Sequence, residues 1–266
     1  MRIVSAGHAV FAAVLIGLGI QGFVKGDFTA VWQPVPEGVP GRALLVYLCA
    51  AVSLASGLGL LWRRTAAPAV RVLLASLFLW LLVWRVRALF IATLVEGTWS
   101  FGETLVMMAG AWVLFVWFAT DRDRQRLGLV ADDRSLRIAR ALYGVGLIPF
   151  GYAHFAFVKE TADLVPGWIP GHLAWAYFTG GTFIAAGVAI LVGVCARLAA
   201  ALSAWQMGLF FVLVWIPKAA AGSMSAFNWG EFASNLALIG AGWVVAESYR
   251  GLPWLAVGRV RVPAPA

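Results

Sequence analysis

Residues 151–187 read GYAHFAFVKETADLVPGWIPGHLAWAYFTGGTFIAAG, and a degenerate copy, GIQGFVKGDFTAVWQPVPEGVPGRALLVYLCAAVSLASG, lies at 19–57. Each copy holds the end of one apolar segment, a loop with prolines, and the start of another apolar segment. Residues that match at a constant offset of 130 positions are Val35 and Val165, Pro36 and Pro166, Pro40 and Pro170, Gly41 and Gly171, Tyr47 and Tyr177, Ala55 and Ala185, and Gly57 and Gly187. Such a repeat fixes the architecture, so we expect two related units in the chain.

The composition indicates an integral membrane protein. Apolar residues make up 62% of the chain and charged residues only 12%, whereas about a quarter of the residues in a soluble domain are charged. Apolar runs of about 20 residues recur, and each is long enough to cross a bilayer as a helix. The net charge of +8 comes without a basic stripe interleaved with aromatic residues, so we expect no nucleic-acid partner.

The fold class that we predict is all-α, a polytopic membrane protein with eight transmembrane helices arranged as two tandem four-helix bundles in parallel orientation. The expected spans are roughly 7–24, 43–62, 70–92, 102–119, 138–157, 173–193, 198–217 and 232–249. The expected divisions are a first, degenerate unit at 1–119, a charged linker at 120–137, a second unit at 138–250 and a tail at 251–266.

The distribution of basic residues predicts the orientation of the helices. Fourteen of the twenty Lys and Arg residues lie at one end, in the termini, the 120–137 linker and the short connections on that side. Seven of the twelve acidic residues lie at the opposite end. Because cytoplasmic loops are enriched in Lys and Arg, we expect a multi-pass protein of the cell (inner) membrane with both termini and the linker in the cytoplasm. The proline-rich loops would then face the periplasm.

One pattern in the second half resembles the DoxX-like family of small membrane proteins. The pattern runs G-x-x-H-F, T-A-x-L-V-P-x-W-I-P, W-x-Y-x-T-G and A-A-G, and it is carried here by Gly151, His154, Phe155, Thr161, Ala162, Val165, Pro166, Trp168, Pro170, Trp175, Tyr177, Thr179, Gly180 and Gly187. The match covers about 138–249, whereas the first half matches weakly and has Gly22 near the place of the histidine. The chain thus looks like two fused DoxX-like units.

The resemblance implies a four-helix bundle for each unit and a redox-associated subunit that binds quinone or a lipid-like molecule near the outer leaflet. Some relatives belong to a thiosulfate:quinone oxidoreductase, and most have no assigned chemistry, so the resemblance leaves open whether this chain is an enzyme. Quinone is the only cofactor it suggests. The partners expected are membrane lipids and a membrane or periplasmic protein. Two alternatives stay open: a non-catalytic assembly protein that recruits a periplasmic partner through the proline-rich loops, and a small-molecule transporter.

Several side chains are candidates for ligand binding near the outer ends of the expected helices. His154 lies about one turn inside its span and would bond a quinone carbonyl or relay a proton; the alternative is a buried histidine bonded to a neighbouring helix. Arg87 and Lys218 end similar stretches and would hold an anionic group, unless they extend to the membrane interface. Trp175 and Tyr177 belong to the family pattern. No residues have the spacing of a metal site.

Two glutamates complete the candidates. Glu103 follows Ser100 and Glu231 follows Asn228 at the spacing of a capping box, so we predict that each begins a helix. The functional alternative is an ion pair of these carboxylates with Arg87 or Lys218 beside a pocket. Gln206 lies near the middle of its expected span, and we predict that it bonds across helices.

Overall fold

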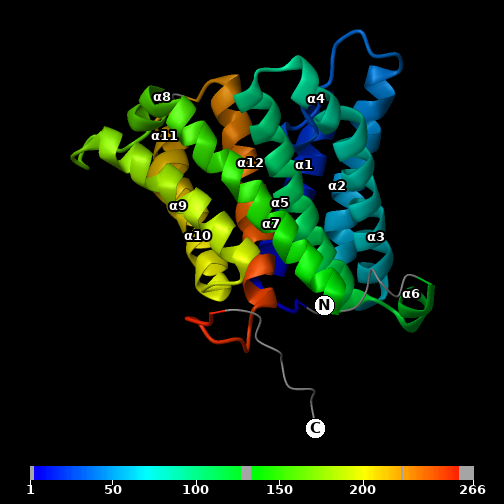
Figure 1. Cartoon of the computed structure of the whole chain (residues 1–266). Helices are drawn as coiled ribbons and strands as arrows, with labels where there is room; N and C mark the ends of the chain where they lie inside the picture. Colours follow the sequence, from blue (N-terminus) through cyan, green and yellow to red (C-terminus); the bar gives the residue numbers. More distant parts are fainter. Residues whose placement is uncertain (1–2, 127–132, 223, 258–266) are drawn as a thin grey trace.

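The computed structural model describes residues 3–126, 133–222 and 224–257, and its named elements in these ranges are helical (Figure 1). The first half contains α1 (Ala6–Lys25), η1 (Ala30–Trp32), α2 (Arg42–Leu60), α3 (Arg63–Trp80), η2 (Leu81–Arg85), α4 (Val86–Ile91), α5 (Leu94–Phe118) and α6 (Asp121–Arg126). The second half contains α7 (Asp133–Ala156), α8 (Val158–Asp163), α9 (His172–Val192), α10 (Ala196–Phe210), η4 (Phe211–Trp215), α11 (Ile216–Ala220) and α12 (Ala226–Ser248).

Six of the described helical segments are long and apolar enough to cross a membrane. They are Ala6–Lys25, Arg42–Leu60, Arg63–Ile91, Leu94–Phe118, His172–Val192 and Ala196–Ala220. These six match six of the eight expected spans, and they confirm the membrane class. Helices α7 and α12 are also long, with 24 and 23 residues, but they are more polar. Arginines occupy the first turns of α7, and α12 carries Asn228, Glu231 and Asn235.

The long helices form a closed ring, and α12 makes additional contacts across its middle with α5 and, less extensively, with α7. In order around the ring, α1 packs on α2, α2 on α3, α3 on α5, α5 on α7, α7 on α9, α9 on α10, α10 on α12, and α12 again on α1. Helices α5 and α12 pack against each other across the ring. The two halves of the chain are therefore joined along three helix contacts and one continuous apolar core. The expected division near residue 120 stays a prediction.

Two local features recur at the 130-residue spacing seen in the sequence. Helices α2 and α9 both begin after a glycine with left-handed backbone, Gly41 (φ 71°) and Gly171 (φ 75°), a conformation that glycine adopts without a steric penalty. A π-helical turn interrupts the third long helix of each half, at Leu81–Arg85 and at Phe211–Trp215. Such turns insert one residue and re-aim the side chains beside them, and they are frequent at functional sites.

Small residues let the helices of each half approach closely. On the α7–α9 contact, a Cβ atom built on Gly151 would lie 2.4 Å from the carbonyl oxygen of Gly180, and one on Gly187 would lie 2.6 Å from that of Gly144. On the corresponding α1–α2 contact, a Cβ atom on Gly57 would lie 2.7 Å from the carbonyl oxygen of Ala12. Glycine contacts of this kind are typical of helix packing in membranes, where close van der Waals contact drives association.

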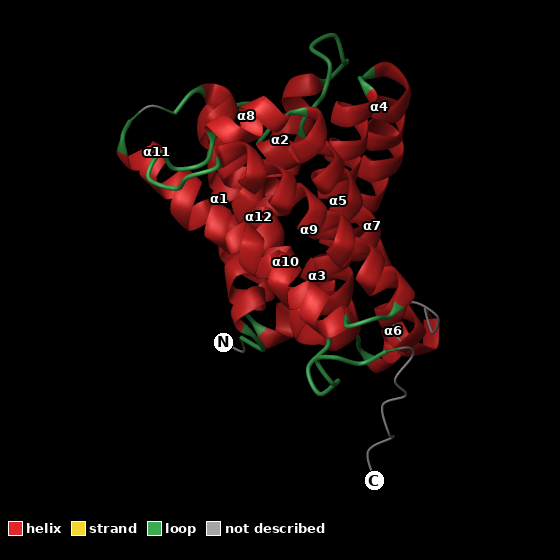
Figure 2. Cartoon of the chain, turned by 60° about the vertical axis from the view of Figure 1, so that its left-hand side comes forward, coloured by secondary structure: helices red, strands yellow, loops and turns green. Residues whose placement is uncertain are grey.

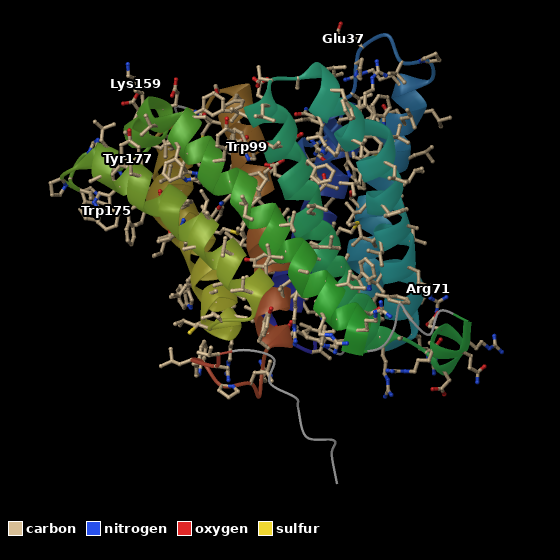
Figure 3. The ribbon with its side chains drawn as sticks, viewed as in Figure 1. Glu37, Arg71, Trp99, Lys159, Trp175 and Tyr177 are labelled. Carbon is tan, nitrogen blue, oxygen red and sulfur yellow. The ribbon has the colours of Figure 1, made fainter. Side chains whose placement is uncertain are left out.

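The two ends of the ring differ in what they carry. The first described residue, α6 and the described end of the chain lie at one end, and the loop with Glu37 and helix α8 with Lys159 lie at the other (Figures 1 and 3). Figure 2 shows the loops gathered at these two ends. We call the end with Glu37 and Lys159 the loop end, and the end with α6 the linker end.

At the linker end, Asp123 holds α6 against the ring. Its carboxylate accepts hydrogen bonds from the Thr120 amide (2.8 Å) and hydroxyl (2.6 Å), and it pairs with Arg71 (3.1 Å). Burial acts to raise the pKa of Asp123, but the Thr120 hydrogen bonds and the Arg71 guanidinium outweigh it, so the pKa lies below its usual value. This pair fixes the start of the linker to α3. Figure 3 shows the labelled Arg71 at the linker end.

Candidate functional site

The seven residues singled out from the sequence fall into four groups in the structure. Glu103 on α5 and Glu231 on α12 are close enough to interact electrostatically, and His154 lies on α7 among aromatic side chains. Lys218 on α11 is half-buried and Arg87 on α4 is exposed. Trp175 and Tyr177 are 45% and 53% exposed on the outer flank of α9 (Figure 3). Tyr177 stacks on Phe155, with 6.0 Å between ring centroids, so these two aromatic candidates face the surroundings rather than the glutamates.

The prediction that Glu103 and Glu231 belong to capping boxes at helix starts is wrong. Helix α5 begins after Thr93, whose hydroxyl accepts a hydrogen bond from the Glu96 amide (3.3 Å). Helix α12 begins after Ser225, whose hydroxyl accepts one from the Asn228 amide (3.1 Å). Glu103 and Glu231 therefore lie inside their helices, where they have no capping role. Both lie at the α5–α12 contact, and their carboxyl groups are close enough to interact electrostatically.

Arg85, which is not among the site residues predicted from the sequence, is the cation beside Glu103. Its side chain is 1% exposed. Its Nε donates to the Thr104 hydroxyl (2.9 Å) and its terminal nitrogen to the Val31 carbonyl oxygen (3.0 Å), and its charge acts on Glu103. Among the described residues no ion pair is formed by Arg87 or Lys218. The guanidinium opposite Glu103 thus comes from Arg85, two residues before the one predicted.

The helix periodicity explains why Arg85 points inward. Buried residues recur along α3 and η2 every three or four positions, as expected for one face of a helix; they are Ala66, Val70, Leu73, Leu77 and Leu81. Arg85 is the next position of this series, and Arg87 lies on the opposite side. The sequence contained this signal, because a charged residue that continues an apolar stripe inside a span is expected to face protein and to have a partner.

A small cavity opens beside the cluster. Its lining residues come from four elements: Val31, Arg85, Glu103, Thr104, Met107, Ser234 and Leu238. Its volume of about 10 Å³ is roughly the space that one water molecule requires. Ser234 is only 5% exposed, and none of the hydrogen bonds found within the described ranges involves its hydroxyl. The cavity therefore presents a free hydroxyl, a guanidinium and a carboxyl group to whatever occupies it.

His154 forms a second, separate arrangement where α7, α9 and α10 meet. Its Nδ1 lies 2.7 Å from the carbonyl oxygen of Phe150. Its ring stacks on Phe210 and meets the edge of Phe183, with centroid distances of 5.9 and 5.5 Å. A carbonyl oxygen only accepts hydrogen bonds, so Nδ1 carries the proton, and in the neutral ring Nε2 is an acceptor. Among the described residues, the only hydrogen bond found for this ring is that of Nδ1.

His8 shows what a purely structural histidine looks like in this protein. It is fully buried, its Nδ1 accepts a hydrogen bond from the Val4 amide (3.3 Å), and its Nε2 lies 3.0 Å from the Leu60 carbonyl oxygen. Both ring nitrogens are therefore used. His154 instead keeps one nitrogen free beside aromatic rings, and its bonded partner is its own helix rather than the neighbouring helix that the structural alternative required.

Gln206 bonds across helices, as predicted. Its side-chain oxygen accepts from the Thr182 hydroxyl (2.6 Å) and its amide nitrogen donates to the Thr179 carbonyl oxygen (3.0 Å), which ties α10 to α9. Gln206 is thus satisfied by protein groups and is not a site residue.

No group of three or more His, Cys, Asp or Glu residues in the described part of the chain is placed to hold a metal ion. Comparisons with protein-family models, with curated proteins and with solved structures found no match for this chain. Function has to be argued from the two sites themselves.

Proposed function

We propose that this chain is a DoxX-like membrane protein with eight spans, in which α7 and α12 cross the membrane together with the six apolar segments. Both helices run alongside segments that are apolar enough to span: α7 packs between α5 and α9, and α12 contacts α1, α5 and α10. A helix enclosed in this way tolerates polar residues because they face protein rather than lipid. The recurrent glycine caps and π-helical turns support two related units of the same direction.

The proposed orientation places the linker end in the cytoplasm and the loop end in the periplasm. It is tested with single cysteines in a background in which Cys49 and Cys195 are serine. We expect Glu37→Cys and Glu160→Cys, both at exposed positions, to react with an impermeant maleimide in intact spheroplasts. Asp121→Cys, at the linker end, should react only after lysis. Labelling of Asp121→Cys in intact spheroplasts, with protection of the other two, would reverse the orientation.

We propose further that the protein binds a membrane-soluble quinol, or a lipid-like molecule with a similar hydroxyl group, at His154. The carrying observation is an Nε2 without a hydrogen-bond partner among the described residues, on an imidazole ring that contacts Phe183 and Phe210. An acceptor nitrogen takes a hydrogen bond from a hydroxyl group, and flanking rings favour contact with a planar aromatic head group. A quinone carbonyl would instead need a donor at this nitrogen, so the neutral histidine selects the reduced form.

This proposal makes the chain the binding subunit of a redox system. His154 would orient the quinol and accept its hydroxyl proton. The two electrons of the quinol would pass to an acceptor on a partner protein. The side chain at Phe210 would set the orientation of the ring plane, because its own ring stacks at 25° to the imidazole.

Replacing His154 by alanine is expected to weaken binding of a short-chain quinol to the purified protein in nanodiscs by about tenfold. This corresponds to a total loss of about 1.4 kcal/mol from one hydrogen bond and the ring contacts. His172→Ala, near the same end but in the first turn of α9, is the matched control and should bind like the unchanged protein. Tryptophan fluorescence quenching measures the affinity. Equal affinities of the His154→Ala and His172→Ala variants would refute this site.

A second candidate function, recruitment of a periplasmic partner, is favoured by one observation. Trp168 lies between Pro166 and Pro170 in the loop before α9 and is 75% exposed. Exposed tryptophans are enriched in the central contacts of protein interfaces. A partner retained by the His154→Ala variant but lost from Trp168→Ala in crosslinking would favour assembly over quinol binding.

A further inference from the structure

Two carboxyl groups and one guanidinium form a cluster near the contact of α5 with α12. They belong to Glu103, Glu231 and Arg85. Arg85 is 1% exposed and its charge acts on Glu103, which in turn acts on Glu231. One guanidinium neutralises one carboxylate, and a second carboxylate would remain as an uncompensated negative charge. A buried charge without a partner is costly, whereas a protonated carboxyl group is a neutral hydrogen-bonding group.

Within the described ranges, no other charged group is shown to neutralise the second carboxylate. At the loop end, the elements packed on α5 and α12 carry Arg87 on α4, Lys25 at the end of α1 and His154 on α7. Lys218, on α11 beside η4, is half-buried and forms no ion pair among the described residues. Arg87 and Lys25 are exposed, and His154 is bonded to Phe150 at the contact with α9. Glu96 lies at the start of α5 and accepts a hydrogen bond from the Thr93 hydroxyl (2.9 Å). Within the described ranges, the three charged groups therefore form a set of their own.

The cavity beside the cluster gives an independent indication of a bound species. Ser234 is 5% exposed and lines the cavity, and none of the hydrogen bonds found among the described residues involves its hydroxyl. A buried hydroxyl left without a partner carries a desolvation cost. One water molecule fits the cavity and would bridge Ser234 to Glu103, as buried waters commonly do between polar groups.

We propose that Glu103 and Glu231 share a single proton in a water-containing site between Arg85 and Ser234, so that the α5–α12 contact is a proton-binding site between the two halves of the protein. The site is distinct from His154, which lies among α7, α9 and α10. Arg85 is the last residue of the π-helical turn η2 in the first half, and Glu231 belongs to the second half. Gain or loss of the proton therefore acts directly on the contact that joins the halves. This inference does not depend on quinol binding.

Infrared difference spectroscopy at neutral pH tests the proposal. Spectra of the unchanged protein minus the Glu231→Gln variant, and minus the Glu103→Gln variant, should each show the C=O stretching band of one protonated carboxyl group, with a shift in D₂O. In each variant one carboxyl group remains for one guanidinium, so charge balance keeps that carboxyl group ionised and the whole band is lost. Glu160→Gln, on exposed α8, is the matched control and should leave the band unchanged.

The Arg85→Met variant provides a second test by the same infrared measurement. Without the guanidinium, both carboxyl groups require a proton, so the band should grow about twofold relative to the unchanged protein. A band that persists in either glutamine variant would show that the carboxyl groups bind protons independently. Absence of the band from the unchanged protein would show that both are ionised. Either result overturns the proposal, and glutamine is close enough in shape to glutamate for the two single variants to fold.

Discussion

Replacing Arg85 with methionine is expected to lower the free energy of unfolding by about 3–5 kcal/mol, because two buried acceptors lose hydrogen bonds and Glu103 must take up a proton in place of its cation. The substitution leaves the Val31 carbonyl oxygen and the Thr104 hydroxyl without the hydrogen bonds that Arg85 now donates. It also leaves Glu103 without its cation. Methionine fills a similar volume, so the loss reports on charge and hydrogen bonding rather than on a cavity.

Arg87→Met is the matched control for this prediction. Arg87 is two residues away on the same helical segment, is exposed, and has no ion pair among the described residues, so its replacement should change stability by no more than about 0.5 kcal/mol. Unfolding titrations in mixed micelles measure both values. If the double variant Arg85→Met with Glu103→Gln is no more stable than Arg85→Met alone, the two side chains are not coupled as described.

Replacing Gly151 with alanine is expected to destabilise the protein by about 1–3 kcal/mol, because the added methyl group overpacks a helix contact. The new Cβ atom would lie 2.4 Å from the Gly180 carbonyl oxygen and 2.5 Å from the Ile184 side chain. The first neighbour is backbone and cannot rotate away. Helices α7 and α9 would have to separate, and His154, one turn further along α7, would lose its contact with Phe183.

Gly181→Ala is the control for that substitution. Gly181 follows Gly180 on α9, but a Cβ atom there has open space around it, so alanine should stabilise the helix by about 0.5–1 kcal/mol through its better helix propensity. The same unfolding titrations compare the two variants. Equal effects of Gly151→Ala and Gly181→Ala would mean that the close contact between α7 and α9 does not limit stability.

Local patterns predicted some side chains well and others badly. Gln206 bonds across helices as expected, since a polar side chain inside an apolar span has few other partners. The capping-box spacing at Ser100 and Asn228 gave a wrong prediction of the helix starts, because the same spacing also occurs inside a continuous helix. The two helices begin after Thr93 and Ser225, further upstream. Arg85 was recognisable from its place in the apolar stripe, but the identity of its partners was not.

The sequence by itself determined that this is a helical membrane protein, where its apolar helices run, and that two stretches share matching residues 130 positions apart. These properties follow from composition and from periodicity along the chain, which need no knowledge of distant residues. Only the tertiary structure decided that α1 closes on α12, that α5 meets α12 across the ring, and that Arg85, Glu103 and Glu231 come together there. Residues so far apart in sequence meet only through helix packing, because close approach of small residues and the π-helical turns set which faces touch.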